Sequence, residues 1–406
     1  MIPTTSPICI IGAGPAGAVA SLFLTKLKIK HLVLEKETFP RDKICGDGLD
    51  LNTLRVLHHY DPSSIAEFIG KTDTCVPLTA LRLYAPNGGF SDMYAHSGNV
   101  NRPLYVVAKR KDFDNWLFEK LPSEYATIIT QAEVTDLVRE NDKITIHFSH
   151  QNMAHQVVTP LVFGADGDHS TVQRKLDVRK IDRRYYAAAL RQYYQNITPI
   201  AGEPRLEVYF PKKLPFGYFW IFPLPNGTSN VGLGMQSAEL SATKTNLREA
   251  LQDIIQNDPV IAPRFAQATP LETAKGWGLP LASRLRKAYG DNYLLLGDAA
   301  SLIHPLSGEG IGSAMISGYI AAHLAEKAIA ATRYDDAFLM PYQKEIGRRL
   351  VSETNFYRRI INLRPDIWQR FFLNTLINSG LGKRLFERSA AKWLETAFTK
   401  KIVLEF

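Results

Sequence analysis

The N-terminal segment PICIIGAGPAGAVASLFLTKL, residues 7–27, places a glycine turn between a short β-branched run and a longer apolar run. The first run predicts a buried strand. Pro15 suits the first position of the helix that follows, because proline has no N–H to leave unpaired there. The run HLVLEKE, residues 31–37, predicts a second strand. A strand, a helix and a strand in this order form a βαβ unit, which requires a parallel sheet covered on its faces.

Three glycines of the turn, Gly12, Gly14 and Gly17, have the spacing G-x-G-x-x-G. Without side chains, the backbone can turn tightly and approach a pyrophosphate at the positive end of the helix. Glu35 ends the second predicted strand, where an acidic residue is expected to accept hydrogen bonds from an adenosine ribose. The spacing predicts a dinucleotide site but does not distinguish FAD from NAD. No second such turn follows a strand, so a second permanently bound dinucleotide is not expected.

Strand patterns continue along most of the chain, and NLREALQDII (246–255) and residues 310–330 predict helices. The strand-like runs are TALRLYA, PLYVVA, ITIHFSH, PLVFGAD, RLEVYF, GYFWIFPL, SNVGLGM and YLLLGDA. This mixture predicts an α/β fold in which a parallel sheet domain is interrupted by a more antiparallel one. From about residue 335 the strand patterns end, and NFYRRIINL, DIWQRFFLNTLI and LGKRLFERSAAKWL predict a separate helical C-terminal region.

Positive charge is concentrated in the C-terminal region. Of the formal net charge of +8, residues 341–406 contribute +7, with 13 Lys and Arg against 6 Asp and Glu. This asymmetry favours an anionic partner such as a lipid headgroup, a polyphosphate or nucleic acid, although a solvated helical face gives the same pattern. The sequence contains no recognised nucleic-acid module, so nucleic acid is not expected as a partner.

Residues 6–25 carry no charge, but they do not resemble a signal peptide or a membrane span. No Lys or Arg precedes them, and glycines and a proline interrupt their apolar centre. Cys9, Cys45 and Cys75 are too few and too scattered for a disulfide framework or a zinc site, which favours a reducing compartment. These features predict a cytoplasmic protein with no metal and no transmembrane helix, whose membrane contact would be peripheral and at the inner face.

Two later motifs extend the pattern of the glycine turn. GADGDHSTVQRK (164–175) follows an apolar strand, and LLLGDAASLIHPLSGEGIGSAM (294–315) follows another and opens a helix. With the N-terminal turn and in this order, they resemble the p-hydroxybenzoate hydroxylase-like superfamily of FAD oxidoreductases. Within it, FPRDKICGDG (39–48) and PFGYFWIFP (215–223) are similar to the geranylgeranyl reductase family, whose members reduce isoprenoid double bonds. The resemblance covers roughly residues 6–330.

The resemblance implies a Rossmann-type FAD-binding domain with an inserted antiparallel-sheet substrate domain and a helical C-terminal region. The expected segments are 1–75, 100–180 and 276–334 for the FAD-binding domain, 76–99 and 181–275 for the substrate domain, and 335–406 for the C-terminal region. NAD(P)H or a reduced electron carrier is the implied transient electron donor. The donor stays open, because relatives commonly carry arginine immediately after the position of Val172, whereas this chain has Gln173 followed by Arg174.

The resemblance also assigns residues to the cofactor. Asp298 is a short, fixed carboxylate that would accept hydrogen bonds from the ribityl hydroxyls, and Arg110 would lie near the phosphates. The helix after the glycines at 308–312 would aim its positive end at the flavin N1/C2=O edge. The expected cofactor-binding residues are Gly12, Gly14, Gly17, Glu35, Arg41, Cys45, Gly46, Arg110, Asp166, Asp298, Pro305, Gly308, Gly310, Ile311 and Gly312.

The resemblance places Cys45 and Gly46 beside the isoalloxazine, on a loop that forms part of the substrate cavity wall. A thiol there is small enough to clear the flavin, and it can pack against an apolar substrate or supply a proton. Arg41 and Lys43 would lower its pKa, but two neighbouring aspartates oppose them, so the sign of the shift is open. Asp47 is a second candidate proton donor, where relatives commonly have a small residue. The alternative is a packed cysteine with no chemical role.

Tyr218, Trp220 and Phe222 alternate along one predicted strand and therefore share a face. Such a file suits domain core as well as a substrate wall, but the Y-x-W-x-F-P pattern resembles the reductase family's, in which this strand lines the substrate cavity. An apolar wall suits a polyprenyl chain, which must be held by contact area. Flavin-dependent halogenases carry a similar W-x-W-x-I-P motif, and Tyr218 and Phe222 favour the reductase.

The predicted function is FAD-dependent reduction of carbon–carbon double bonds in an isoprenoid or polyprenyl lipid. An isolated alkene is a poor hydride acceptor, so an acid must lie within reach, and Cys45 and Asp47 are the candidates. The basic, aromatic C-terminal helices would contact an anionic membrane, where such a substrate resides. The alternatives are a flavin-dependent monooxygenase or halogenase on the same fold, and a module that binds flavin or lipid without turnover.

Overall fold

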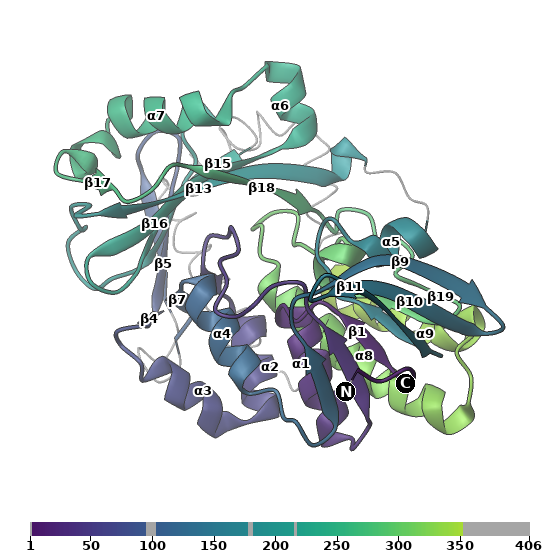
Figure 1. Ribbon diagram of the computed structural model, residues 1–406. Helices are drawn as coiled ribbons and strands as arrows, with labels where there is room; N and C mark the ends of the chain where they lie inside the picture. Colours follow the sequence, from purple (N-terminus) through teal and green to yellow (C-terminus); the bar gives the residue numbers. More distant parts are fainter. Residues whose placement is uncertain (1, 95–102, 178–181, 215–216, 352–406) are drawn as a thin grey trace.

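The computed structural model describes residues 2–94, 103–177, 182–214 and 217–351. Two large sheets organise them. A mainly parallel sheet with its helices forms the lower half of Figure 1, and a larger, mostly antiparallel sheet lies above it. The fold class predicted from the sequence is therefore confirmed.

The parallel sheet has six strands in the order β19-β20-β12-β1-β2-β8. The bounds are β1 (Cys9–Ile11), β2 (His31–Leu34), β8 (Ala126–Ile129), β12 (Val162–Gly164), β19 (Tyr289–Gly290) and β20 (Tyr293–Leu295). All neighbours pair in parallel except β19, which is antiparallel to β20. The central strands β1, β2, β12 and β20 are buried throughout and apolar except at His31, as expected for strands covered on both faces.

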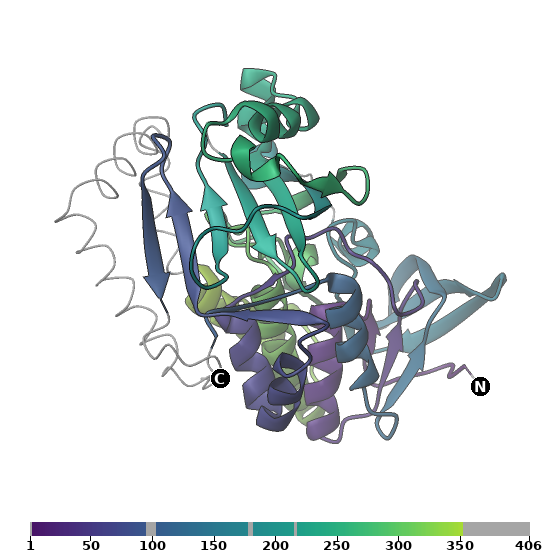
Figure 2. The same cartoon turned by 90° about the vertical axis from the view of Figure 1, so that its left-hand side faces the viewer.

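Helices α1 (Pro15–Lys26) and α8 (Ile311–Ala331) contribute most of their residues to the core of this sheet. They cross closely, because a Cβ on Gly318 would lie 2.3 Å from the carbonyl oxygen of Ala16. Further helices of this half are α2 (Leu51–Tyr60), α3 (Pro62–Ile69), α4 (Arg110–Glu119) and α5 (Thr171–Leu176). A three-stranded antiparallel sheet lies on the side away from α1 and α8 (Figure 2); its strands are β9 (Ala132–Glu140), β10 (Lys143–His150) and β11 (Met153–Thr159).

The large sheet has the order β17-β13-β16-β15-β14-β5-β6, and β18 also pairs with β13. The bounds are β5 (Ala80–Tyr84), β6 (Phe90–Tyr94), β13 (Tyr186–Gln195), β14 (Leu206–Tyr209), β15 (Gly217–Pro223), β16 (Thr228–Gln236), β17 (Thr269–Pro270) and β18 (Lys275–Pro280). Two helices, α6 (Ser237–Thr243) and α7 (Leu247–Asn257), lie above the sheet in Figure 1. Phe219 and Ile221 share the hydrophobic cluster that contains Leu251 and Ile254 of α7, so alternate residues of β15 point to the opposite face.

A small sheet, β3-β7-β4, connects the two halves. Its strands are β3 (Gly48–Leu49), β4 (Cys75–Leu78) and β7 (Tyr105–Ala108). Gly48 is the last residue of the loop 42–48, which contains Cys45 and is called the cysteine loop below. It pairs with Val107, so this sheet fixes one end of that loop.

The strand runs named from the sequence are present, and so are the helices expected at 246–255 and 310–330. Ten of the described strands were not predicted: β3, β4, β6, β8, β9, β11, β13, β17, β18 and β19. Helix α9 (Asp336–Ile346), at the start of the predicted C-terminal region, packs into the core of the parallel sheet. There Tyr342 is fully buried and donates a 2.7 Å hydrogen bond to the carbonyl of Leu295. A short π-helix follows at Gly347–Val351. The domain bounds remain a prediction.

The three basic aromatic runs after α9 lie outside the described residues, and so does the membrane contact predicted for them. Of the helices that the structure describes, none combines the length and apolar character that a bilayer crossing needs.

Candidate functional site

The glycine turn connects β1 to α1 where β1 ends, at the carboxyl edge of the parallel sheet. Gly12 has φ +97°, and a Cβ on Gly17 would lie 1.9 Å from the Gly12 carbonyl oxygen, so neither position accepts a side chain without movement. A Cβ on Gly14, by contrast, would meet only the Arg41 guanidinium, at 3.6 Å. Gly14 precedes α1 without a side-chain cap. The first N–H groups of α1 are therefore available for an anion beside open space.

Glu35 lies beside this turn, as the spacing predicts. Its side chain is almost fully buried, and its Oε2 accepts a 2.7 Å hydrogen bond from the backbone N–H of Ala13. Oε1 accepts from the N–H of Glu37 at 2.9 Å. These contacts fix the carboxylate next to the glycine turn; its bond to a ribose remains a prediction.

Arg41 and Arg110 meet at one carboxylate. Arg110 forms a bidentate pair with Asp114, at 2.6 Å from Nε and 2.7 Å from Nη2, and Arg41 Nη1 donates to the same side chain at 3.1 Å. The Arg110 guanidinium is thus already paired, while Arg41 also reaches the open side of Gly14. Arg110 is the arginine expected near the phosphates, but Arg41 is the better placed for an anion at the glycine turn.

Asp166 caps α5, because its Oδ2 accepts from the N–H groups of Thr171, at 2.6 Å, and Val172, at 3.2 Å. Its Oδ1 is buried and has no hydrogen-bond partner among the described residues. Burial raises the pKa of this carboxyl. The unpaired oxygen can accept a hydrogen bond from a bound group, consistent with the predicted role.

Asp298 follows β20, and its Oδ1 lies 3.7 Å from the Cβ position of Gly310, which precedes α8. Burial raises the pKa of Asp298, and the positive charge of Lys43 opposes this. Helix α8 begins without a side-chain cap or an acidic residue in its first turn. The uncapped start of α8 provides N–H donors for the edge of a ring, and the Asp298 carboxylate beside it provides acceptors for a polyol chain.

The glycines at 308–312 differ in what they contact. Gly308 has φ +73°, and a Cβ there would lie 2.6 Å from the Tyr218 hydroxyl. A Cβ on Gly312 would lie 2.4 Å from Asp50 Oδ1, the atom that caps α2 through the N–H of Thr53. Gly312 therefore makes room for a neighbouring carboxylate. Pro305 and Ile311 belong to the same loop and helix start, and their cofactor contacts remain predictions.

The cysteine loop, residues 42–48, lies between the two halves. Cys45 is partly buried, and burial raises the pKa of its thiol; the nearby Arg110 charge opposes the shift and Asp47 adds to it. The sequence leaves open whether the pKa of Cys45 is raised or lowered, and in the structure it is raised. The thiol is therefore protonated at neutral pH. Lys43 lies 3.5 Å from the centre of the Trp277 ring, and burial lowers the pKa of its amine to about 8.

Asp47 has 0% exposure and a left-handed backbone with φ +66°. Its Oδ2 accepts 2.7 Å hydrogen bonds from the Tyr193 hydroxyl and from Asn230 Nδ2, and its Oδ1 accepts from the N–H of Arg110 at 3.2 Å. Burial raises the pKa of Asp47 to about 6 against these three donors. The carboxyl therefore links the cysteine loop to β13 and β16 of the large sheet.

The aromatic file, Tyr218, Trp220 and Phe222, faces both motif loops, with ring centres 5.8 Å and 6.0 Å apart along the strand. A Cβ on Gly46 would lie 3.3 Å from Phe222 and 3.7 Å from Trp220. The Tyr218 hydroxyl donates to the carbonyl of Ser307 at 2.6 Å. The expected shared face is confirmed, and contact with a lipid remains a prediction.

Sequence reasoning missed several polar residues of this junction, namely Asp50, Tyr105, Tyr193, Asn230 and Glu309. Tyr105 donates to Glu309 Oε1 at 2.6 Å, and burial raises the pKa of Glu309. Burial likewise raises the pKa of Asp50 to about 6. The available signal was a polar residue inside an apolar pattern, such as the asparagine of SNVGLGM and the glutamate of PLSGEGIG.

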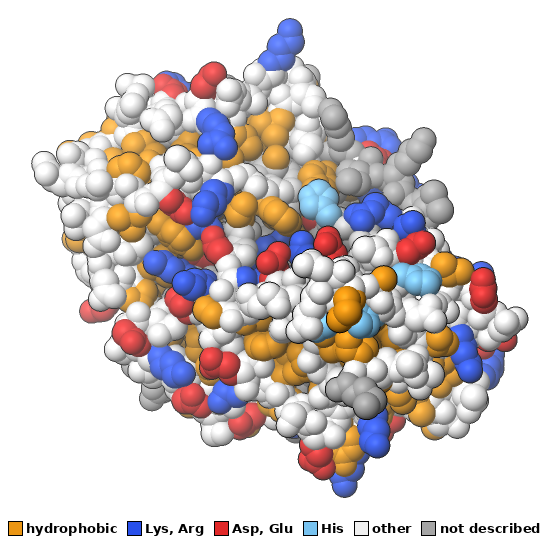
Figure 3. All heavy atoms as spheres, in the orientation of Figure 1, with side chains coloured by type: hydrophobic (Ala, Val, Ile, Leu, Met, Phe, Trp, Pro, Cys, Tyr) orange, Lys and Arg blue, Asp and Glu red, His pale blue; other side chains and the backbone are white. Residues whose placement is uncertain are grey.

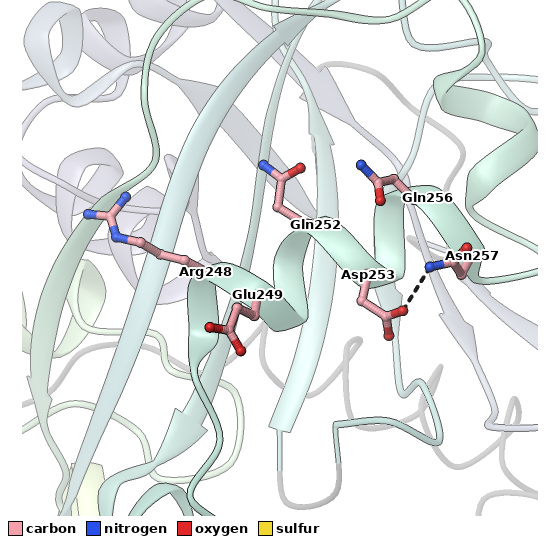
Figure 4. Close-up of a pocket in the computed structure, with 6 residues that line it drawn as sticks. All are labelled: Arg248, Glu249, Gln252, Asp253, Gln256 and Asn257. Carbon is pink, nitrogen blue, oxygen red and sulfur yellow. Dashed lines mark hydrogen bonds between the residues drawn. The ribbon is translucent and has the colours of Figure 1, made fainter.

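Charged side chains of both signs gather where the two halves meet in Figure 3. Buried Arg191 of β13 contributes to this boundary, with 2.8 Å to Asp42 and 2.5 Å to Glu272. The hollow drawn in Figure 4 is elsewhere, on the outer surface of α7, and is lined by the polar residues Arg248, Glu249, Gln252, Asp253, Gln256 and Asn257. It contains no motif residue and is not a candidate for this chemistry.

Residues 5–350 match the FAD binding domain family, and the chain belongs to that family. It is an FAD-dependent oxidoreductase, and it is similar to digeranylgeranylglycerophospholipid reductases. Its sequence is 29% identical over 363 residues to the digeranylgeranylglycerophospholipid reductase of Methanococcus vannielii, covering 88% of this chain and 87% of the relative. The enzyme of the same name from Methanocaldococcus jannaschii is 27% identical over 403 residues, covering 97% and 95%.

Solved structures share the fold. A geranylgeranyl bacteriochlorophyll reductase-like protein from Thermoplasma acidophilum superimposes with a TM-score of 0.80 at 22% identity, over 97% of this chain and 99% of that one. The flavin-dependent brominase Bmp2 gives a TM-score of 0.77 at 20% identity, over 96% and 94%. The fold therefore does not separate reductases from halogenases, and that distinction depends on the residues of the site.

Proposed function

We propose that this protein reduces carbon–carbon double bonds of an isoprenoid lipid, with FAD as its bound cofactor. The observation that carries the proposal is the contact between the cysteine loop and the aromatic file, where the Gly46 position lies within 3.7 Å of both Trp220 and Phe222. An apolar wall beside a small, protonated thiol suits an apolar chain that must receive a proton. Relatives of similar length named as digeranylgeranylglycerophospholipid reductases support the same substrate class.

The residues present fit FAD. The free start of α1 and Arg41 would hold the pyrophosphate, Glu35 the adenosine ribose, and Asp298 the ribityl chain, with Asp166 supplying its unpaired oxygen. When bound, FAD supplies the hydride that is added to one alkene carbon. The start of α8 would favour negative charge at the edge of the ring system.

We assign the proton to Cys45. Its side chain is partly exposed, whereas the Asp47 side chain has no exposed surface and its oxygens already accept from three donors. The thiol proton goes to the second alkene carbon, and the resulting thiolate lies beside the Arg110 guanidinium until solvent returns a proton. Asp47 serves this step by holding the loop. The aromatic file orients the chain and excludes water.

The test is anaerobic. The purified flavoprotein is photoreduced, polyprenyl lipids are added in detergent, and flavin reoxidation is followed together with the mass of the lipid. Reoxidation with products heavier by two hydrogens per reduced bond is expected. A flavin that stays reduced until air enters, and then transfers oxygen or activates halide, would refute the proposal and establish a monooxygenase or halogenase. Supplying NAD(P)H and a reduced ferredoxin in parallel identifies which class of electron donor reduces the flavin.

A further inference from the structure

Asn230 lies on β16 with 0% exposure and joins three parts of the site. Its Oδ1 accepts a 2.8 Å hydrogen bond from Trp220 Nε1. Its Nδ2 donates to the Cys45 carbonyl at 2.9 Å and to Asp47 Oδ2 at 2.7 Å. Both amide protons are thus hydrogen-bonded to the cysteine loop, and the amide oxygen is hydrogen-bonded to Trp220 of the substrate wall.

These partners determine the orientation of the amide. The indole of Trp220 can only donate, and the Cys45 carbonyl and the ionised Asp47 can only accept. Turning the amide over would set its oxygen against two acceptors and its nitrogen against a donor. The Asn230 side chain therefore has one compatible orientation, and it places Trp220 and the loop in a fixed relation.

The other contacts between the file and the loop are less directional. Trp220 and Phe222 approach Gly46 by van der Waals contact alone. Asp47 receives its further hydrogen bonds from Tyr193 and from the backbone of Arg110, and the Arg191 guanidinium lies 4.0 Å from the centre of the Tyr193 ring. These groups hold Asp47, but none of them binds both the loop and Trp220 through one side chain, as Asn230 does.

We propose that Asn230 is a positioning residue that fixes the cysteine loop against the substrate wall and so sets the place of the Cys45 thiol relative to an alkene lying on Trp220. The proposal rests on the proposed function for its catalytic consequence, but the positioning itself can be tested without turnover. Loss of the amide should free the loop, while the aromatic wall and the glycine turn persist.

The first readout is the alkylation rate of Cys45 by iodoacetamide in the full-length protein, followed by mass spectrometry at pH 8. Cys9 and Cys75 are buried and serve as internal references. We expect at least a tenfold faster reaction in Asn230→Leu and in the isosteric Asn230→Asp. The matched control is Asn292→Asp: this buried asparagine donates to the carbonyls of Asp142 and Pro160, away from the site. Its Cys45 rate should stay within twofold of the wild-type rate.

The second readout is steady-state alkene reduction at equal FAD content. A misplaced thiol lowers kcat at least tenfold, whereas the KM for the lipid stays within threefold because the apolar wall remains. Cys45 rates within twofold of wild type in both Asn230 variants, or a change in KM alone, would overturn the proposal. A tenfold faster alkylation in a protein that reduces no alkene would leave the positioning role standing and refute the proposed function instead.

Discussion

Replacing Asp47 by Asn tests whether this buried carboxyl titrates as its surroundings require. Burial raises the pKa of Asp47 from 3.8 to about 6, against hydrogen bonds from Tyr193 and Asn230. The folded protein then binds the proton more tightly than the unfolded chain. The stability that Asp47 contributes is therefore complete below the unfolded value of 3.8 and is lost as the pH rises through about 6.

The size of this effect follows from linkage. Each factor of ten in proton affinity is about 1.4 kcal/mol, so the difference between 3.8 and about 6 corresponds to a total of about 3 kcal/mol. Most assays cannot reach the lower end of this range because other carboxylates titrate there. Between pH 5 and pH 8 the same relation gives a loss of about 1.4 kcal/mol for the wild type, which the Asn variant does not share.

The assay is urea unfolding of both proteins at several pH values between 5 and 8, at one fixed FAD concentration. We compare the free energy of unfolding of the two proteins at each pH. The value for Asp47→Asn minus the value for the wild type should rise by about 1.4 kcal/mol from pH 5 to pH 8, even if the variant is more or less stable at every pH. Asp253→Asn is the control: Lys213 lowers the pKa of this exposed carboxyl, so its titration falls below the range and the difference stays flat. A flat difference for Asp47→Asn would refute the reasoning.

Three further predictions concern the cofactor and the thiol. Gly17→Ala should lower the melting temperature, because its Cβ would lie 1.9 Å from a backbone oxygen. Gly14→Ala should fold normally, but flavin titration should show at least tenfold weaker binding of FAD. Cys45→Ala should keep its FAD content and lower alkene reduction by ~100-fold, within the usual range for a general acid; undiminished turnover would exclude the thiol as donor. Arg110→Ala should cost about 1.5 to 3 kcal/mol in urea unfolding, because buried Asp114 loses its bidentate partner and keeps only the 3.1 Å contact with Arg41. A cost below about 1 kcal/mol would contradict this.

The sequence predicts the four central strands of the parallel sheet, β1, β2, β12 and β20, because local patterns suffice there. The glycine turn, the apolar strands and the acid at residue 35 each carry their signal within a few residues, and the structure puts Glu35 directly on the N–H of Ala13. Strand alternation likewise predicts the shared face of the aromatic file. Strands β9 and β11 escape prediction because much of their surface is exposed, which leaves little apolar alternation to detect.

The role of Asp47 could not be predicted, because it depends on partners 146 and 183 residues away in the chain. Neighbouring charges in the sequence suggested a balance at Cys45 between two cations and two aspartates. In the structure burial dominates, and the cation beside the thiol is Arg110. The sequence did not indicate Arg110, which is 65 residues from Cys45 in the chain, while Lys43 also contacts the Trp277 ring and Arg41 contacts Asp114.

The contact between the cysteine loop and the aromatic file explains why Asp47 is flanked by two glycines, Gly46 and Gly48. A buried carboxylate in a left-handed backbone conformation is costly, and the hydrogen bonds from Tyr193 of β13 and Asn230 of β16 offset part of that cost. A Cβ on Gly46 would crowd the Phe222 ring at 3.3 Å and make ordinary contact with Trp220 at 3.7 Å. The glycines thus permit the close approach, and the hydrogen bonds of Asp47 and Asn230 fix the orientation of the loop against the aromatic file.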